Sequence, residues 1–397
     1  MKVKQIAIYL IYSTLISSTV DWLGLVGNVG ISDILFLGLV FVTSYDVAKK
    51  RLIKKKFLHI TLLGVFFVGT SVVTFATSDF SIHIQKNMPL AKGAFFISTI
   101  VYWVKHEGDL KNFLLVLVFI SIVVIVSSYV QSLTPYLSFL WPNQAFSSAR
   151  LEALNIELDI NRSTGIIMGY GLFGSYTLPA SIVFLSYVFA GNLSRAKNVL
   201  FTAAYIFLTI AVLLVSQSRS TLLAAITGSI TVFVLWIPRS NMSVILKYAI
   251  STAITVAMLV LFSDMAEVIV NLHEKSVSSR LRQFILAIEA VPDYMLGTGA
   301  YRASERIGFG GLIHNTYLSV LLKGGILSFI CYLYYHYMSI KYIFSKAKTI
   351  PDEIYLALYG ILAINITEMM LYEGISNLIH YNAVGLCISM WTIRPRK

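Results

Sequence analysis

The feature that most constrains this chain is a series of apolar runs, each of about 18 residues or more, that recur along the whole sequence. Runs of this length are typical of helices that cross a bilayer, because about 20 residues of α-helix span its hydrocarbon core. Only 13% of the residues are charged, which is about half the share found in soluble domains. The sequence therefore predicts an all-α polytopic membrane protein. A β-barrel would instead show alternating segments of about ten residues.

The apolar runs predict about twelve membrane spans, at residues 5–21, 27–45, 57–77, 88–104, 112–130, 164–190, 198–215, 221–237, 247–263, 315–338, 353–371 and 378–393. The first run is expected to be a retained helix, because no small-x-small cleavage site ends it. Most of the 31 Lys and Arg residues fall in segments on the same side as the N-terminus. By the positive-inside rule, both termini are expected to be cytoplasmic. The net charge of +12 then reflects topology and gives no reason to expect a nucleic-acid partner.

Two segments outside the membrane are long enough to carry a site. One covers residues 131–163, and the larger covers residues 264–314 between the ninth and tenth spans. The larger loop is predicted to contain a helix from Ser279 to Val291, capped by Ser278 or Ser279 and ended by Pro292. Its apolar residues are expected to face the membrane body: Leu281, Phe284, Ile285 and Ile288.

The basic residues assigned to the outer side are mainly arginines, whereas lysines dominate inside. The outer set is Arg150, Arg162, Arg219, Arg280, Arg282, Arg302 and Arg306. Arginine presents a planar fork that binds phosphate or carboxylate through two hydrogen bonds and stays charged. Such a cluster indicates an anionic ligand at the outer face. The alternative is that individual arginines pair with acidic residues of the same loops.

The stretch HNTYLSVLLKGG places His314 at the start of the tenth span. A neutral imidazole takes a proton from a hydroxyl at neutral pH, and Asn315 would orient either that imidazole or a substrate. The alternative is a histidine that only caps the helix. Helical spacing puts Tyr317 and Gly325 on the stripe below His314, and Gly325 would allow close helix approach. Lys323 lies within the span and is expected to pair with Glu368.

Several other kinds of site are excluded or disfavoured. Cys331 and Cys387 lie in apolar runs, so neither a disulfide framework nor a cysteine metal site is expected. The chain has no H-E-x-x-H or Walker A motif, and the G-x-G of GTGAYR lacks a strand–helix setting. Glu157 and Asp159 resemble a metal clamp, but the surrounding pattern fits a solvated amphipathic helix better.

In the order of these motifs the chain resembles the O-antigen polymerase and O-antigen ligase superfamily of bacterial inner membranes. Arg219 lies in an S-R-S-x-L-L turn, and Arg280 opens a loop helix that is followed by a proline and G-x-G. The H-N-x-Y-L motif of His314 comes next, with a glycine eleven residues later, and an earlier R-x-x-G begins at Arg162. The resemblance extends over about residues 160–330. Gln283 departs from the pattern, because a tryptophan is common at that position.

The resemblance implies a GT-C-type glycosyltransferase that uses a glycan linked to undecaprenyl pyrophosphate, at the periplasmic face of the inner membrane and without metal or cofactor. It implies catalytic roles for His314, Arg219 and Arg280. Arg162, Arg282, Arg302, Asn315 and Tyr317 are then expected to contact substrates. Expected partners are the lipid-linked oligosaccharide, membrane lipid and a chain-length regulator protein.

The motifs leave the acceptor open. A polymerase passes the glycan to another lipid-linked repeat unit, which is the reading we favour. A ligase passes it to lipid A-core. A flippase or transporter remains a third hypothesis, because Lys92, Lys323 and Glu368 are charged residues within predicted spans.

Overall fold

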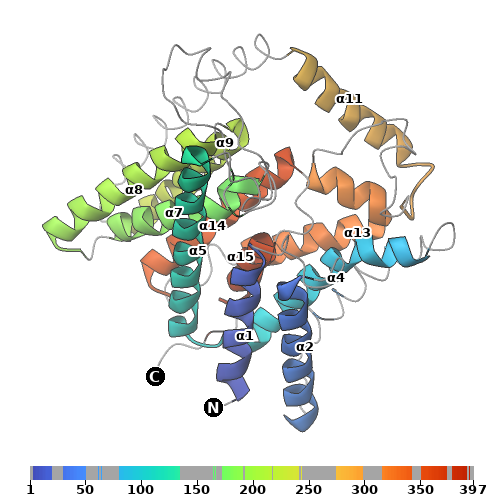
Figure 1. Cartoon of the computed structure of the whole chain (residues 1–397), viewed down its shortest axis with the longest axis horizontal. Coiled ribbons are helices and arrows are strands. Elements are labelled where there is room, and N and C mark those ends of the chain that lie inside the picture. The colour runs from blue at the N-terminus through green and yellow to red at the C-terminus, as the bar shows by residue number, and fades with distance from the viewer. Residues whose placement is uncertain are drawn as a thin grey trace.

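The computed structural model describes residues 3–19, 30–50, 61, 64, 80–134, 164, 166, 172–190, 193–216, 218–240, 243, 274–297, 315–341, 350–372, 378–390 and 393. Over these residues the chain is helical and contains no strand (Figure 1). The helices are α1 (Val3–Ser17), α2 (Ile31–Lys50), α4 (Phe80–Trp103), α5 (Glu107–Leu133), α7 (Phe173–Ala190), α8 (Arg195–Ser216), α9 (Arg219–Trp236), η5 (Ile237–Arg239), α11 (Glu274–Ala290), α13 (Thr316–Ile340), α14 (Asp352–Leu371) and α15 (Leu378–Ser389).

The helices confirm a polytopic all-α membrane protein. Seven of them are long and apolar enough to cross a bilayer: Ile31–Lys50, Glu107–Leu133, Phe173–Ala190, Arg195–Ser216, Ser220–Arg239, Thr316–Ile340 and Asp352–Leu371. The predicted spans at 247–263 and, apart from residues 61 and 64, at 57–77 lie outside the described residues. The loop helix begins at Glu274, five residues before the predicted start. The two serines expected to cap it therefore lie inside it.

The core of the bundle is the group formed by α7, α9 and α14, with α5 and α8 against α7 (Figure 1). Small residues bring these helices together, as is common between membrane helices. A Cβ on Gly360 of α14 would lie 2.6 Å from Ile182 Cγ2 and 2.8 Å from Val232 Cγ2, and one on Gly228 of α9 would lie 2.7 Å from Ile364 Cγ1. The three helices are thus held in one fixed arrangement.

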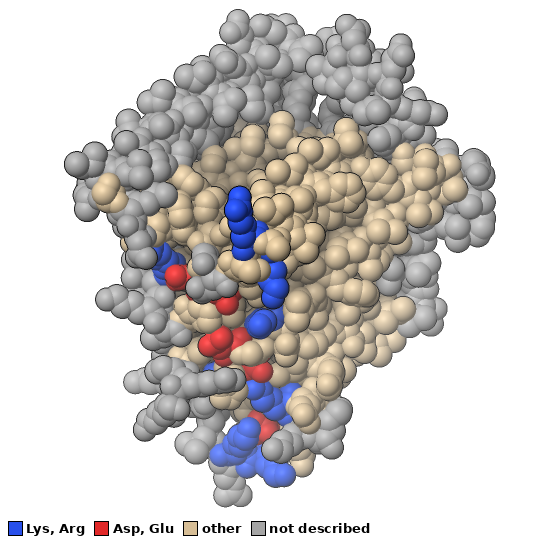
Figure 2. Space-filling model, turned by 90° about the vertical axis from the view of Figure 1, so that its left-hand side faces the viewer, with Lys and Arg blue, Asp and Glu red and all other residues tan. Residues whose placement is uncertain are grey.

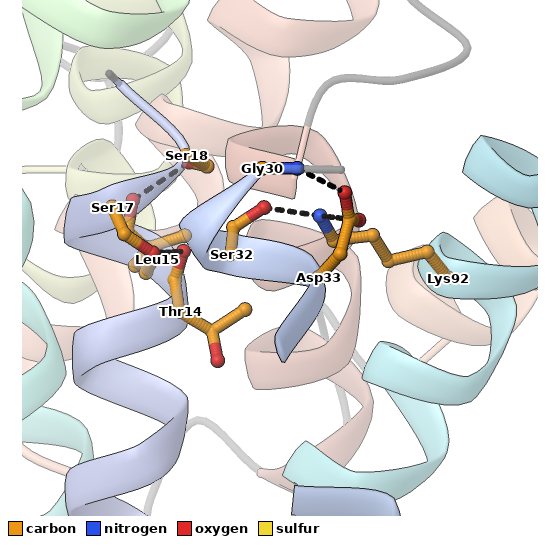
Figure 3. Close-up of polar contacts among 8 residues, drawn as sticks. All are labelled: Thr14, Leu15, Ser17, Ser18, Gly30, Ser32, Asp33 and Lys92. Carbon is orange, nitrogen blue, oxygen red and sulfur yellow. Dashed lines mark hydrogen bonds and ion pairs between the residues drawn. The ribbon is translucent and has the colours of Figure 1, made fainter. Parts of the chain in front are cut away.

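A second group packs α1 against α2, and α4 against α15. Lys92 of α4, which lies within a predicted span, forms an ion pair with Asp33 of α2 (Nζ to Oδ1, 2.8 Å) and donates a hydrogen bond to Ser32 (Figure 3). The Asp33 carboxylate also accepts the Gly30 N–H, at 2.9 Å. The membrane charge of Lys92 therefore has local partners at the start of α2.

Three ion pairs lie at the end of the bundle where α1, α5 and α14 begin and α2 finishes. They are Lys4–Asp109 (2.7 Å), Lys50–Asp46 (2.5 Å) and Arg239–Asp352 (3.2 Å). Figure 2 shows the charged residues of one face in a band through its middle and lower part, with uncharged residues around them. We call the end that holds these three ion pairs the charged end. At the opposite end, which we call the motif end, α14 finishes and α7, α9 and α13 begin.

Candidate active site

A buried carboxylate organises the motif end. Glu368, near the end of α14, has no exposed surface. Its carboxylate accepts hydrogen bonds from Gly174 N (2.8 Å), Ser175 N (2.6 Å) and Ser175 Oγ (2.7 Å) in the first turn of α7. An anion is stabilised there by the free N–H groups and the helix dipole. A Cβ on Gly174 would lie 2.5 Å from Glu368 Oε1, so this contact requires a glycine. The expected Lys323–Glu368 pair is therefore replaced by a helix cap.

The start of α9 lies beside the same carboxylate. The Thr221 side chain is fully buried near Glu368, but its hydroxyl forms no hydrogen bond with the described residues. Deeper in the bundle, the Thr227 and Thr367 hydroxyls are 2.8 Å apart and join α9 to α14. Arg219 is the first residue of α9. Its backbone therefore lies two residues from a side chain that is buried near Glu368.

The start of α13 is tied to the last carbonyl groups of α14. Asn315 Oδ1 accepts the Leu318 N–H at 3.0 Å and caps the helix, while Asn315 Nδ2 donates to Met370 O at 2.8 Å. The Thr316 hydroxyl donates to Tyr372 O at 2.7 Å. Both atoms of the Asn315 amide are therefore used to hold the chain directly after His314. Of its two expected roles, these contacts favour orienting the histidine segment.

The segment after Arg162 is anchored on α5. Gln131 is fully buried, and its side-chain oxygen accepts the Thr164 N–H at 2.9 Å. The Ser127 hydroxyl accepts the Ile166 N–H at 3.3 Å. The backbone two residues beyond Arg162 is thus fixed at the motif end of α5.

Helix α13 is broken at Gly325, where φ is 75° and ψ is −176°. This region of backbone conformation is available essentially only to glycine. Gly297, the first glycine of G-x-G, also has a positive φ of 92° and packs against the break. A Cβ on Gly325 would lie 2.4 Å from Met295 O, and one on Gly297 would lie 2.5 Å from Lys323 O. Gly325 does allow a close approach, but its partner is the backbone of the turn after α11 instead of the helix that was expected.

The break folds the first part of α13 back over the second, as the two orange segments in Figure 1 show. The Tyr317 hydroxyl is 3.4 Å from His336 Nε2, and the Tyr317 ring centroid is 5.5 Å from that of Tyr332. Nineteen residues would separate Tyr317 from His336 by about 28 Å along a straight helix. The predicted span at 315–338 corresponds to α13, but it consists of two helical parts joined at Gly325 instead of one continuous helix. Gly325 ends the helical stripe that starts at His314 instead of continuing it.

The loop helix α11 packs on the first part of α13. Ala287 is fully buried and contacts Leu318 and Leu322, and Gln283 is also buried. Of the residues expected to face the membrane body, Phe284, Ile285 and Ile288 lie outside this contact and remain about half exposed. The small Ala287 side chain allows the closer helix contact. Arg282 lies on the exposed side.

The structure describes some of the predicted site residues in full, others only through their helix, and others not at all. Arg162, Arg302 and His314 lie outside the described residues, although Thr164 and Asn315 near them are placed. Arg219 and Arg280 are placed by their helices, α9 and α11. Arg282, Asn315 and Tyr317 are described in full. The structure thus brings Thr164, the start of α9, α11 and Asn315 to one end of the bundle.

Glu368 and His336 are site-forming residues that sequence reasoning missed. A usable signal for Glu368 was Gly174–Ser175 at the beginning of an apolar run, because small residues leave the first N–H groups of a helix open to a carboxylate. No sequence signal pointed to His336, since its contact with Tyr317 depends on the break at Gly325. Within the described part of the chain, no three His, Cys, Asp or Glu side chains are grouped to hold a metal.

Comparison with known proteins agrees with this arrangement. No curated protein matches the chain. The family model of the O-antigen ligases matches residues 203–333, about a third of the 397 residues. The matched segment runs from α8 into the second part of α13, so it includes Arg219, both arginines of α11 and His314. The match confirms the resemblance to the O-antigen polymerase and ligase superfamily over these residues.

Proposed function

We propose that the protein is a glycosyltransferase that moves a glycan from undecaprenyl pyrophosphate to a sugar hydroxyl, at the motif end of the bundle. One observation carries the proposal. Four segments with arginine or histidine, distant in sequence, come together at this end. The residues after Arg162 bond to Gln131, α9 begins near Glu368, Asn315 bonds to Met370 O, and Gly297, after α11, packs on Gly325. The ligase-family match covers three of these four segments.

In the proposed reaction the acceptor hydroxyl attacks the anomeric carbon of the lipid-linked glycan. A new C–O bond forms while the bond from that carbon to the pyrophosphate oxygen breaks, and the leaving pyrophosphate keeps the electron pair. His314 takes the hydroxyl proton. Arg219 and Arg280 stabilise the negative charge that gathers on the pyrophosphate. Direct displacement of this kind inverts the anomeric configuration.

The leaving pyrophosphate needs arginines because the strongest local anion site is already occupied. The first N–H groups of α7 bind the Glu368 carboxylate. A second anion at that helix end would be repelled. Arginine side chains from neighbouring segments are the remaining groups able to bind it.

Helical periodicity places the two arginines of α11 on different faces of the helix. Arg280 stands three residues before Gln283 and seven before Ala287, so periodicity predicts that it shares the face packed on α13. Arg282 lies on the exposed side. We assign the main pyrophosphate contact to Arg280, and secondary contacts to Arg282, Arg162 and Arg302. Asn315 and Tyr317 act chiefly by fixing the position of His314, and reach the acceptor only from that position.

We favour polymerisation of lipid-linked repeat units over ligation to lipid A-core, with the site at the periplasmic face of the bacterial inner membrane and both termini in the cytoplasm. The resemblance implies a reaction without metal or cofactor, and in this proposal the arginines neutralise the departing pyrophosphate instead. A chain-length regulator would act as a partner protein. Transport has less support, because Lys92 and Glu368 have separate partners on α2 and α7.

The test uses purified full-length protein in detergent with a synthetic undecaprenyl-pyrophosphate repeat unit as sole substrate. A ladder of extended glycans, with inverted linkages and insensitive to chelator, is expected. Transfer only after lipid A-core is added would change the assignment to ligase. No transfer from matched substrates by folded protein would reject the glycosyltransferase and favour the transporter.

A further inference from the structure

Helix α11 presents three different faces. At about 3.6 residues per turn, Gln283 and Ala287 share one stripe, and this stripe is buried against α13. Phe284, Ile285 and Ile288 form a second stripe and are 46%, 46% and 49% exposed. Arg282 and Glu289 form a third stripe, which is polar and exposed. The protein therefore covers only one of the two apolar faces of this helix.

Exposed apolar residues continue from α11 toward a candidate membrane span. After α11, Met295 and Leu296 are 58% and 60% exposed. Met295 O accepts the Ile326 N–H at 2.9 Å, which brings these two residues beside the second part of α13. There Leu327 and Ile330 are 43% and 55% exposed. Exposed apolar residues therefore continue along the chain from the loop helix to Met295 and Leu296, which lie beside a candidate membrane span.

The position of these exposed apolar residues beside α13 indicates that the bilayer covers them. Isolated exposed apolar residues are ordinary, but a contiguous set marks an interaction site. Large apolar side chains on a membrane span face hydrocarbon, and a helix with one apolar and one charged stripe is typical of the bilayer interface. The polar stripe of Arg282 and Glu289 lies next to the apolar one, as a helix lying parallel to the membrane surface requires.

We infer that α11 is an interfacial helix whose apolar stripe lies in the hydrocarbon of the adjacent leaflet, with Arg282 and Glu289 among the lipid headgroups. The partner is the acyl-chain layer of the bilayer. α11 is then fixed at the depth of the lipid phosphates by two contacts, one with α13 and one with lipid. This inference concerns membrane depth alone and does not depend on the proposed reaction.

Nitroxide labels at neighbouring positions test the inference in full-length protein reconstituted into phosphatidylethanolamine–phosphatidylglycerol vesicles. Ile288→Cys reports on the apolar stripe, and Glu289→Cys is the matched control on the polar stripe. The native Cys331 and Cys387 are buried, so unsubstituted protein gives the labelling blank. Ile330→Cys on α13 provides a lipid-facing reference.

The label at position 288 is expected to relax more with oxygen than with a water-soluble nickel chelate, as at position 330, and the label at position 289 should show the reverse. Equal access of the nickel chelate at 288 and 289 would overturn the inference. If Ile288→Cys does not fold, Phe284→Cys reports on the same stripe and must give the same oxygen preference.

Discussion

The two ends of the bundle hold their polar groups in different ways. At the charged end the ion pairs are partly exposed: Lys4 and Asp109 are 33% and 15% exposed, and Lys50 and Asp46 are 58% and 7% exposed. Exposed pairs of this kind contribute about 0–1 kcal/mol. The positive-inside rule predicts basic residues at this end. That prediction does not depend on which acidic residue each lysine pairs with.

At the motif end the polar groups are buried and connect different helices. Glu368, Ser175 and Thr316 have no exposed surface, and each bonds to the end of another helix. A buried polar group without its partner costs about 1–3 kcal/mol, so these contacts fix the helix ends in one geometry. The difference agrees with the proposed placement of the catalytic site at the motif end, because a catalytic site requires a defined arrangement of segments.

The largest expected effect is that of Glu368→Ala. It leaves two buried backbone N–H groups, of Gly174 and Ser175, without an acceptor, at about 1–3 kcal/mol each. A marked loss of stability in detergent is expected. It is measured with a thiol-reactive dye, which reports unfolding through the buried Cys331 and Cys387. Glu368→Gln keeps one acceptor oxygen and should lose less. Wild-type stability of Glu368→Ala would contradict the contrast between the two ends of the bundle.

The glycine contact comes next. Gly325→Ala and Gly297→Ala each place a Cβ within 2.5 Å of backbone atoms at a positive φ, at a cost of about 1–3 kcal/mol for the conformation alone. Both should lower transfer activity as well as stability, because the contact joins the outer loop to α13. Gly108→Ala is the control, since a Cβ there meets nothing within 4 Å. Equal effects of all three variants would show that the contact has no special role.

Asn315→Ala should have an intermediate effect. It removes a helix cap, worth about 1 kcal/mol, and the bond to Met370 O. Asn315→Ser keeps a capping hydroxyl but cannot reach Met370, so it should recover stability without recovering transfer activity. Full recovery of activity by serine would assign Asn315 to capping alone. The comparison needs initial transfer rates beside the dye-based unfolding curves.

The smallest effect is expected for Lys4→Met at the charged end. Asp109 keeps its hydrogen bonds from Lys105 N and His106 N, both 3.0 Å, so stability should fall by less than about 1 kcal/mol. The same unfolding assay at low and high salt checks this value. A loss as large as that of Glu368→Ala would contradict the contrast between the two ends.

Apolar periodicity and charge predicted most of the helices and the segments of the motif end, because both are local properties of the sequence. The start of α11 differs from the prediction by five residues, because the helix begins at Glu274. The fold-back at Gly325 was not predictable. A glycine pair in an apolar run permits close packing or a break, and the choice depends on Gly297, 28 residues earlier in the chain.

The partners of the buried charges also could not be predicted from the sequence. Lys323 and Glu368 both lie in apolar runs, and opposite charges suggested a pair. The structure satisfies Glu368 with the N–H groups of α7 instead. Those backbone donors have no sequence signature beyond small residues at a helix start. Likewise, the apolar residues of α11 were recognisable, but which stripe packs on α13 depends on the closer approach that Ala287 allows.

The most direct test of the central claim compares two histidines at opposite ends of the bundle. His314→Ala at the motif end and His106→Ala at the charged end, before α5, are assayed for glycan transfer from a synthetic undecaprenyl-pyrophosphate donor. A general base contributes about 10²–10⁴-fold, so His314→Ala should lose at least 100-fold in kcat with unchanged unfolding, while His106→Ala stays within about twofold of wild type. Wild-type activity of His314→Ala, or an equal loss in His106→Ala, would contradict the placement of the chemistry at the motif end.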